Sequence, residues 1–217
     1  MIDKFVYDIP TRILYGAGSL KDLHEEALPG KKALVVISRG GSVKRHGQLD
    51  ALVAELDAAG VGHVLYEGVR PNPTAGNVDE AAELAVHEGC DFVVALGGGS
   101  VMDAAKAIAL VATNEGSCWD YAPSVTGGQK APEAAPLPLV CVTTSAGTGS
   151  EVDMWAVISN DETQEKTGYP TMYPTISIVD SDMMMSVPPT FTAWQGGEKA
   201  LTGTIIIRQT GLVNGLT

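Results

Sequence analysis

Along this chain, short runs of apolar residues alternate with segments whose apolar positions repeat at helical spacing. The apolar runs predict buried strands at residues 32–38, 62–67, 91–96, 138–143 and 175–179. The helical patterns cover residues 43–59, 78–88 and 100–112. Strands that are apolar throughout and separated by helices are typical of a parallel sheet covered on both faces. We therefore expect an α/β fold, a Rossmann-like doubly wound parallel sheet, which binds ligands at the carboxyl ends of its strands.

Three other segments have different patterns. Residues 5–15 alternate apolar and polar positions around Pro10, as an edge strand does. Residues 121–138 are rich in proline and predict a long loop, and residues 155–169 predict a hairpin because a polar segment separates two apolar flanks.

A glycine-rich turn joins the third predicted strand to the helix that follows. Gly97, Gly98, Gly99 and Ser100 come directly between the two. Bare backbone amides at a helix N-terminus form a concave set of donors where the helix also adds partial positive charge. The turn therefore predicts a site for a phosphate or pyrophosphate. It lacks the Gly-Lys-Ser/Thr ending of a P-loop.

A second loop of small residues follows the strand at 138–143. Its sequence, Thr143-Thr-Ser-Ala-Gly-Thr-Gly-Ser-Glu151, offers hydroxyl groups from Thr143, Thr144 and Thr148. These groups suit ribose or phosphate oxygens. The alternative is structural, because Thr148 and Glu151 also have the spacing of a capping box that only starts a helix.

A third loop follows the first predicted strand and opens the first helix. Dinucleotide folds often place an acidic residue here to bind the ribose 2′-hydroxyl, but this loop has none. It carries Gly40, Gly41 and Ser42 instead, followed by Lys44 and Arg45. Amides, a hydroxyl and cations suit a 2′-phosphate. A solvated basic helix start is the alternative.

Two charged residues are further candidates for ligand contact. Asp103 is predicted in the first turn of the helix after the three glycines, where it either complements the helix dipole or accepts a hydrogen bond from a ligand amide. Lys166, in the predicted hairpin, is either a solvated charge or a ligand contact.

Composition narrows the classes of partner and compartment. Lys and Arg number 14 against 26 Asp and Glu, a net charge of −12 that argues against a nucleic-acid or membrane partner. An anionic ligand must then be held by local donors. Three cysteines without paired spacing indicate reduced thiols, and with no apparent signal peptide or spanning segment we expect a cytoplasmic protein.

The motifs together resemble the iron-containing alcohol dehydrogenases. The resemblance rests on Gly97–Lys106 and Thr143–Glu151, and on Arg70-Pro-Asn-Pro-Thr74, Pro174-Thr-Ile-Ser-Ile-Val-Asp180 and Val187-Pro-Pro189. The segment 40–44 is similar to the NADP-using, butanol-dehydrogenase-like branch. This resemblance implies an N-terminal dinucleotide-binding domain of the dehydroquinate-synthase-like fold, followed by an all-helical domain. It also implies hydride transfer between NADP(H), or NAD(H), and an alcohol or aldehyde.

The resemblance assigns roles to the candidate residues. It implies that Gly98, Gly99 and Ser100, next to Gly97, hold the pyrophosphate, and that Asp103 orients the nicotinamide amide. Thr143, Thr144 and Thr148 would line the cofactor site, and Lys166 would approach the nicotinamide ribose. The set Gly40, Gly41 and Ser42 would receive the 2′-phosphate.

The similarity ends near Gln195. The family pattern continues with an Asp and a His that bind the metal, whereas Lys199 and Gly203 stand in those places here and Glu198 is one place off. We therefore expect a dinucleotide-binding domain at 1–190 and an altered start of the helical domain at 191–217, with the rest of that domain missing. We expect neither Fe²⁺ nor Zn²⁺ to bind this chain.

These observations leave three readings open. The chain is an NADP-dependent alcohol dehydrogenase or aldehyde reductase, a module that binds NADP(H) without efficient catalysis, or a lyase related to dehydroquinate synthase. We expect a small alcohol or aldehyde as substrate. We also expect a homo-oligomer, because an uncovered apolar face and the segment Ile205-Ile-Ile207 favour self-association.

Overall fold

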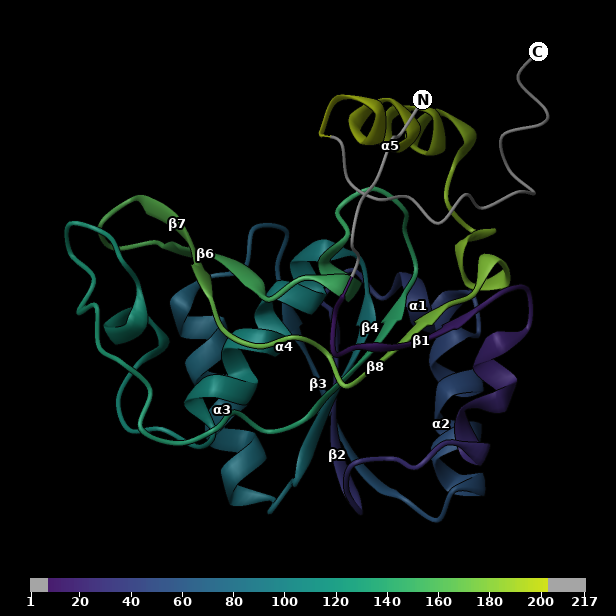
Figure 1. Cartoon of the computed structure of the whole chain (residues 1–217), viewed down its shortest axis with the longest axis horizontal. Helices are drawn as coiled ribbons and strands as arrows, with labels where there is room; N and C mark the ends of the chain where they lie inside the picture. Colours follow the sequence, from purple (N-terminus) through teal and green to yellow (C-terminus); the bar gives the residue numbers. More distant parts are fainter. Residues whose placement is uncertain (1–7, 203–217) are drawn as a thin grey trace.

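The computed structural model describes residues 8–202 and contains a central sheet of six parallel strands (Figure 1). The strand order is β1-β8-β5-β4-β2-β3. The strands are β1 (Arg12–Tyr15), β2 (Lys32–Ser38), β3 (Gly62–Val69), β4 (Phe92–Gly97), β5 (Leu139–Thr143) and β8 (Ile176–Val179). The expected doubly wound parallel sheet is confirmed.

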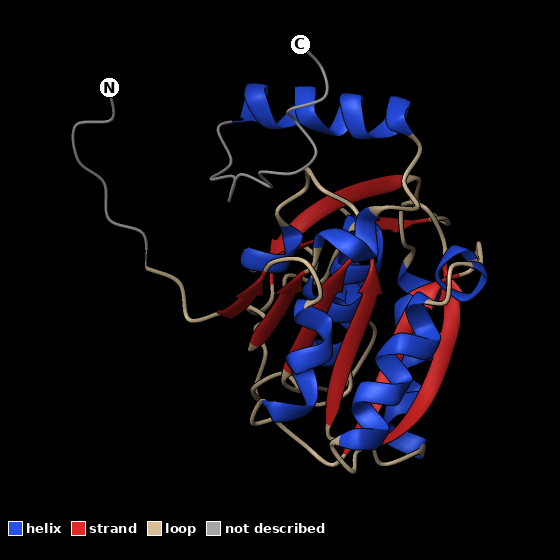
Figure 2. Ribbon diagram, turned by 90° about the vertical axis from the view of Figure 1, so that its right-hand side faces the viewer, coloured by secondary structure: helices blue, strands red, loops and turns tan. Residues whose placement is uncertain are grey.

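Helices cover both faces of the sheet (Figures 1 and 2). One face packs against α3 (Ala75–His87) and α4 (Gly99–Val111), and the other against α2 (Gln48–Ala58) and the 3₁₀ helix η1 (Ser19–Glu25). Along β2, Leu34 and Val36 enter the first core, while Ala33, Val35 and Ile37 enter the second. This alternation explains why the strand is apolar throughout, because both of its faces are buried.

The sheet changes direction between β2 and β4. The chain moves outward from β2 to β3 and then returns to place β4 on the other side of β2. In doubly wound folds the crevice at such a switch point, beside the carboxyl ends of the strands, is where ligands bind. The loops after β2, β4 and β5 all leave from this edge.

The expected hairpin forms as β6 (Trp155–Asn160) and β7 (Glu165–Pro170), which pair antiparallel beside α4. The segment expected as an edge strand forms β1 at the sheet edge, beginning at Arg12 after Pro10, and residues 1–7 lie outside the description. Residues 118–121 form a short 3₁₀ helix, η2 (Cys118–Tyr121), at the start of the expected long loop. Among residues 8–202, no helix is long and apolar enough to cross a membrane.

One predicted helix is wrong in detail. Residues 43–59 form two helices, α1 (Ser42–Arg45) and α2, instead of one. Gly47 separates them with a φ of 72°, a left-handed conformation that a helix cannot continue through. Two further 3₁₀ helices, η3 (Ser150–Val152) and η4 (Ser181–Met184), and the terminal helix α5 (Pro189–Thr202) complete the fold.

Candidate functional site

The glycine loop after β4 and the small-residue loop after β5 lie side by side. Gly97 and Thr143, the last residues of the two strands, are direct partners in the sheet. The backbone N–H of Thr144 donates to the carbonyl of Gly97 at 3.0 Å. The two strongest motifs of the sequence are therefore one continuous surface at the carboxyl edge.

Close packing explains the three successive glycines. A Cβ atom built on Gly97 would lie 2.6 Å from Cγ2 of Val101, and one on Gly99 would lie 2.7 Å from Cγ2 of Thr148. A Cβ on Gly98 would lie 2.7 Å from the hydroxyl of Ser145. Only residues without a side chain allow the loop to approach both its own helix and the neighbouring loop this closely.

The start of α4 presents unpaired backbone donors. The helix begins at Gly99 after Gly98, and no side chain caps it. Within the part of the chain described, the N–H groups of Gly98, Gly99 and Ser100 have no hydrogen-bond acceptor, and all three residues are partly exposed. Three free donors at the positive end of a 13-residue helix form a surface that fits an anion such as a phosphate.

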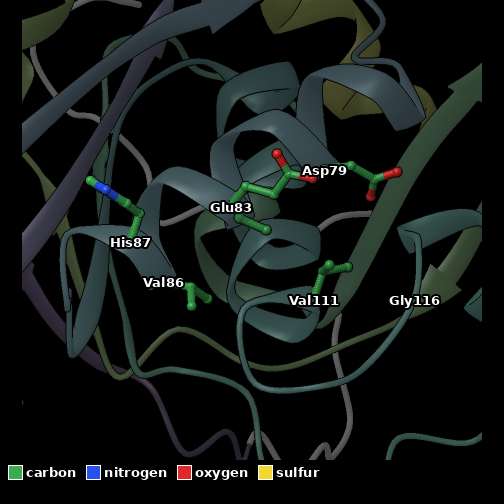
Figure 3. A pocket seen from close by; sticks show the side chains of 7 residues that line it. Asp79, Glu83, Val86, His87, Val111 and Gly116 are labelled. Atoms are coloured by element: carbon green, nitrogen blue, oxygen red, sulfur yellow. The ribbon is translucent and has the colours of Figure 1, made fainter.

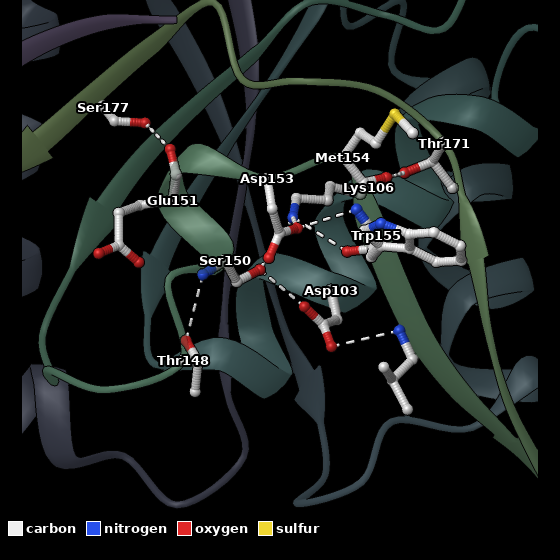
Figure 4. Close-up of polar contacts among 11 residues, drawn as sticks. Asp103, Lys106, Thr148, Ser150, Glu151, Asp153, Met154, Trp155, Thr171 and Ser177 are labelled. Carbon is white, nitrogen blue, oxygen red and sulfur yellow. Dashed lines mark hydrogen bonds and ion pairs between the residues drawn. The ribbon is translucent and has the colours of Figure 1, made fainter. Parts of the chain in front are cut away.

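Asp103 lies next to this surface, on the second turn of α4 and not on the first turn as expected, because the helix already begins at Gly99. Its carboxylate accepts hydrogen bonds from the hydroxyl of Ser150 at 2.7 Å and from the N–H of Val157 at 3.2 Å (Figure 4). Burial raises the pKa of Asp103, while the hydrogen bond from Ser150 and the charge of Lys106 oppose that shift.

Sequence analysis missed the role of Lys106. The side chain is fully buried, and its ammonium group donates to Ser150 Oγ at 3.0 Å, Asp153 Oδ1 at 2.7 Å and the carbonyl of Trp155 at 3.0 Å (Figure 4). A signal was present, because Lys106 stands on the apolar side of a helix among alanines and isoleucine. A lysine in such a position is rarely buried without a partner.

The threonines of the second loop differ in their exposure. Thr143 is fully buried, and its hydroxyl donates to the carbonyl of Ser145 at 2.7 Å. Thr144 is half-buried and Thr148 is exposed. The expected capping box is wrong: η3 begins after Gly149, which has no side-chain cap, and the Thr148 hydroxyl only accepts from the N–H of Ser150 at 3.3 Å.

The loop with Gly40, Gly41 and Ser42 lies at the carboxyl end of β2, next to β4 in the sheet. Gly41 has a φ of 64°, which favours glycine, and Ser42 is exposed. The cations nearby already have partners: Arg45 donates to the carbonyl of Gly40 at 2.8 Å, and Lys44 forms an ion pair with Glu67. Glu67, on β3, is an acidic neighbour that sequence analysis did not identify.

Lys166 lies on β7 and is exposed. Its ammonium group donates to Oδ1 of Asn72 at 2.7 Å, and Asn72 has a left-handed φ of 56°. The N–H of Ser159 on β6 donates to the carbonyl of Pro73 at 2.9 Å. The hairpin that carries Lys166 is thus tied to the loop after β3.

Helix α5 lies beyond the carboxyl ends of the strands (Figure 2). The Gln195 side chain accepts a hydrogen bond from the N–H of Ala146 at 3.3 Å, which joins the helix to the loop after β5. Among residues 8–195, whose side chains the structure describes, no group of three or more His, Cys, Asp or Glu residues is placed to hold a metal ion. Gly203 and Ile205-Ile-Ile207 lie outside the described residues.

A separate pocket of about 330 Å³ lies at the far end of α4 (Figure 3). Its wall includes Val111, the last residue of that helix, and Glu83, Val86 and His87 of α3. The glycine loop precedes the first residue of α4, so this pocket and the carboxyl edge are different places. None of the residues predicted for the site lines it.

Known proteins share this architecture. The profile of the family described as iron-containing alcohol dehydrogenase matches residues 10–181. A choline dehydrogenase of Bacillus subtilis is 42% identical over 194 residues, which cover 88% of this chain and 47% of that protein. The NADH-dependent butanol dehydrogenase B of Clostridium acetobutylicum is 37% identical over 195 residues, which cover 89% of this chain and 48% of that protein.

Solved structures agree with the sequence relatives. An archaeal halo-thermophilic alcohol dehydrogenase from a Red Sea brine pool superposes with a TM-score of 0.82 at 41% identity, covering 91% of this chain and 51% of that one. The chain spans about half the length of the relatives that it matches. The match includes the glycine loop, the loop after β5 and the hairpin, and the chain belongs to the iron-containing alcohol dehydrogenase family.

Proposed function

We propose that this chain binds NADP(H) at the carboxyl edge of its sheet and acts in hydride transfer between that cofactor and an alcohol or aldehyde. The observation that carries the proposal is the set of free N–H groups at Gly98, Gly99 and Ser100, at the N-terminus of α4 and beside the switch point. The membership of the family supports the reaction class.

Each candidate residue has a place in this proposal. The amides after Gly97 bind the pyrophosphate, and Thr144 and Thr148 line the cofactor beside them, with the buried Thr143 holding the loop in shape. Asp103 accepts a hydrogen bond from the carboxamide of the nicotinamide. Lys166 contacts the nicotinamide ribose. The bound nicotinamide ring supplies or accepts the hydride.

The preference for NADP(H) is proposed from the loop after β2. The amide of Gly40 and the hydroxyl of Ser42 suit a 2′-phosphate, and no carboxylate follows the strand to repel it. The N–H of Gly41 donates to the carbonyl of Ser38 at 3.4 Å, a long bond that a phosphate oxygen would replace. Two facts favour NAD(H) as the alternative: Lys44 is already paired with Glu67, and several relatives are named as NADH-dependent butanol dehydrogenases. Both cofactors must therefore be compared directly.

A second candidate function is cofactor binding without efficient turnover. It is favoured by Lys199, which stands where the pattern implied by the resemblance has an acidic metal ligand. A lysine cannot take the place of a carboxylate ligand. We further propose that residues 1–190 form the dinucleotide-binding domain and that residues 191–217 are an altered start of the all-helical domain that the resemblance implies.

The test combines binding with turnover. Dissociation constants for NADPH and NADH are measured by fluorescence, and reduction of a short aldehyde is followed in the same samples after chelation and after addition of Fe²⁺ or Zn²⁺. Turnover that returns with metal supports the dehydrogenase, and binding without turnover in every sample supports the binding module. Absence of binding to either cofactor contradicts both.

A substitution tests the cofactor preference. Ser42→Asp places a carboxylate where the 2′-phosphate is expected and should weaken NADPH binding about tenfold or more, with little change for NADH. Ser42→Ala is the matched control, because it removes the hydroxyl without adding charge. Equal weakening of NADPH and NADH in Ser42→Asp would contradict the proposed position of the 2′-phosphate.

A further inference from the structure

Lys106 is a buried charge that the proposed function does not use. Among residues 8–195, whose side chains the structure describes, it is the lysine with no exposed surface, and it lies on α4 one turn beyond Asp103. Burial of an ammonium group carries a large desolvation cost that must be offset by hydrogen bonds and a counter-charge. The partners of a lysine buried in this way therefore indicate which parts of the structure it holds together.

The three donors of the ammonium group are all used. They reach Ser150 at the start of η3, Asp153 directly after it, and the backbone carbonyl of Trp155 at the start of β6. Lys106 therefore joins the cofactor-facing helix to the loop after β5 and to the hairpin. Asp153 is the counter-charge, at 2.7 Å.

The bond to Ser150 fixes the direction of a second hydrogen bond. A serine hydroxyl has one proton to donate. Because the Ser150 oxygen accepts from Lys106 at 3.0 Å, its proton is directed to its other partner, Oδ1 of Asp103, at 2.7 Å. Figure 4 shows Lys106, Ser150 and Asp103 close together, with Ser150 between the other two.

With these hydrogen bonds in place, the Asp103 carboxylate can still accept further hydrogen bonds. An ionised carboxylate has about four acceptor positions. Ser150 uses one on Oδ1 and the N–H of Val157 uses one on Oδ2, so each oxygen keeps an acceptor position. A carboxylate held in this way can accept an amide N–H from a ligand, whereas a carboxylate rotated away from the ligand cannot.

We propose that Lys106 is a positioning residue that, through Ser150, holds the Asp103 carboxylate oriented toward the carboxamide of the bound nicotinamide. The inference rests on the proposed function, because it requires a dinucleotide at the carboxyl edge. In this role Lys106 and Ser150 favour a nicotinamide that carries N–H donors. They act through Asp103 and do not contact the cofactor themselves.

The test uses the whole chain and two variants, Lys106→Met and Ser150→Ala. Dissociation constants are measured for NADPH and for its 3-acetylpyridine analogue, in which a methyl ketone replaces the carboxamide and removes both N–H donors. The ratio of the two constants reports the hydrogen bond to Asp103, and a general loss of structure would weaken both ligands together.

We expect the parent chain to prefer NADPH over the analogue by about tenfold, the size of one charge-assisted hydrogen bond. Both variants should reduce that preference to about twofold or less. Lys32→Met is the matched control, since Lys32 also pairs with a carboxylate, Glu88 at 3.1 Å, but at the start of β2. It should leave the preference unchanged.

The outcomes separate the two proposals. An unchanged preference in folded Lys106→Met and Ser150→Ala overturns the role of Lys106 while cofactor binding stands. If Lys106→Met does not fold, Ser150→Ala decides, because it removes the hydroxyl and keeps the buried ion pair. A parent chain that binds both dinucleotides equally overturns the positioning role, and one that binds neither overturns the proposed function as well.

Discussion

Individual glycines in this chain serve two different purposes. Gly41, Gly47 and Gly149 have left-handed backbone conformations, with φ values of 64°, 72° and 72°. Gly97 and Gly99 do not, and are required by the atoms that surround them. The first kind could be replaced only with strain in the backbone, whereas the second kind could be replaced only if a neighbour moved.

The first prediction compares two glycines. Gly97→Ala places a methyl group 2.6 Å from Cγ2 and 2.8 Å from Cβ of Val101, so we expect it to lower the free energy of unfolding by about 1–3 kcal/mol. Gly76→Ala is the control, because Gly76 lies in α3 with nothing near the new Cβ. The control should be neutral or more stable by about 0.5–1 kcal/mol. Urea unfolding measures the free energy of unfolding of both variants, and equal changes in the two would contradict the packing argument.

At the scale of residues, the sequence predicted positions better than partners. The glycines and threonines of the two loops were found because their chemistry is local to a strand end. Lys106 and Glu67 were not, since their partners Asp153 and Lys44 lie 47 and 23 residues away in the chain. An ion pair of this kind depends on which elements pack together, and the hydrophobic periodicity of the sequence does not predict that packing.

Among the elements, the 3₁₀ helices η1 and η4 are joined by one side chain. Asp180, directly after β8, is buried, and its carboxylate accepts from the N–H groups of Gly18 at 2.9 Å, Leu20 at 3.0 Å and Asp182 at 2.9 Å. The carboxylate therefore caps η4, which follows it directly in the chain. It also accepts from N–H groups at the start of η1, about 160 residues earlier in the sequence. Two elements at the sheet edge are joined by this carboxylate.

We expect Asp180→Ala to be among the more damaging substitutions. It would leave three backbone N–H groups without their acceptor, at a cost of about 2–4 kcal/mol in the free energy of unfolding. Asp182→Ala, an exposed neighbour in the same 3₁₀ helix, should change stability by less than about 0.5 kcal/mol. Chemical denaturation measures both, and equal losses would mean that Asp180 has no special role.

The elements themselves were predicted well where they are buried on both faces. The five buried strands and the hairpin were found in the right order, with boundaries that differ by one or two residues. The helix at 43–59 was predicted as continuous because apolar spacing persists through Gly47, and only the backbone conformation there shows the break. The switch point between β2 and β4 was not predicted, because it depends on the order of the strands in the sheet and the pattern of a single segment does not give that order.

At the scale of the whole molecule, an apolar surface remains uncovered on α5. Phe191 and Trp194 are 53% and 65% exposed, and their rings contact each other edge to face at 5.1 Å. Met185, just before the helix, is 68% exposed. Exposed aromatic pairs of this kind are typical of surfaces that another body covers.

We therefore expect this chain to self-associate through α5. The double substitution Phe191→Ser and Trp194→Ser should weaken association about tenfold or more, since buried aromatic residues dominate such contacts. Val125→Ser, at a 96% exposed position in the long loop, is the control. Sedimentation or light scattering over a range of concentrations measures the effect. A parent chain that stays monomeric throughout, or a double variant that associates as the parent does, would contradict it.

The place of β1 at the sheet edge has a consequence for how the protein is made. Its partner in the sheet is β8, and about 160 residues separate the two strands. A ribosome that adds about 5–20 residues each second needs roughly 8–30 s to produce that length. Throughout that time β1 lacks β8, its neighbour in the sheet, while β2 to β5 can already assemble behind it. Nascent chains of this protein therefore carry β1 as an unpaired strand until β8 emerges.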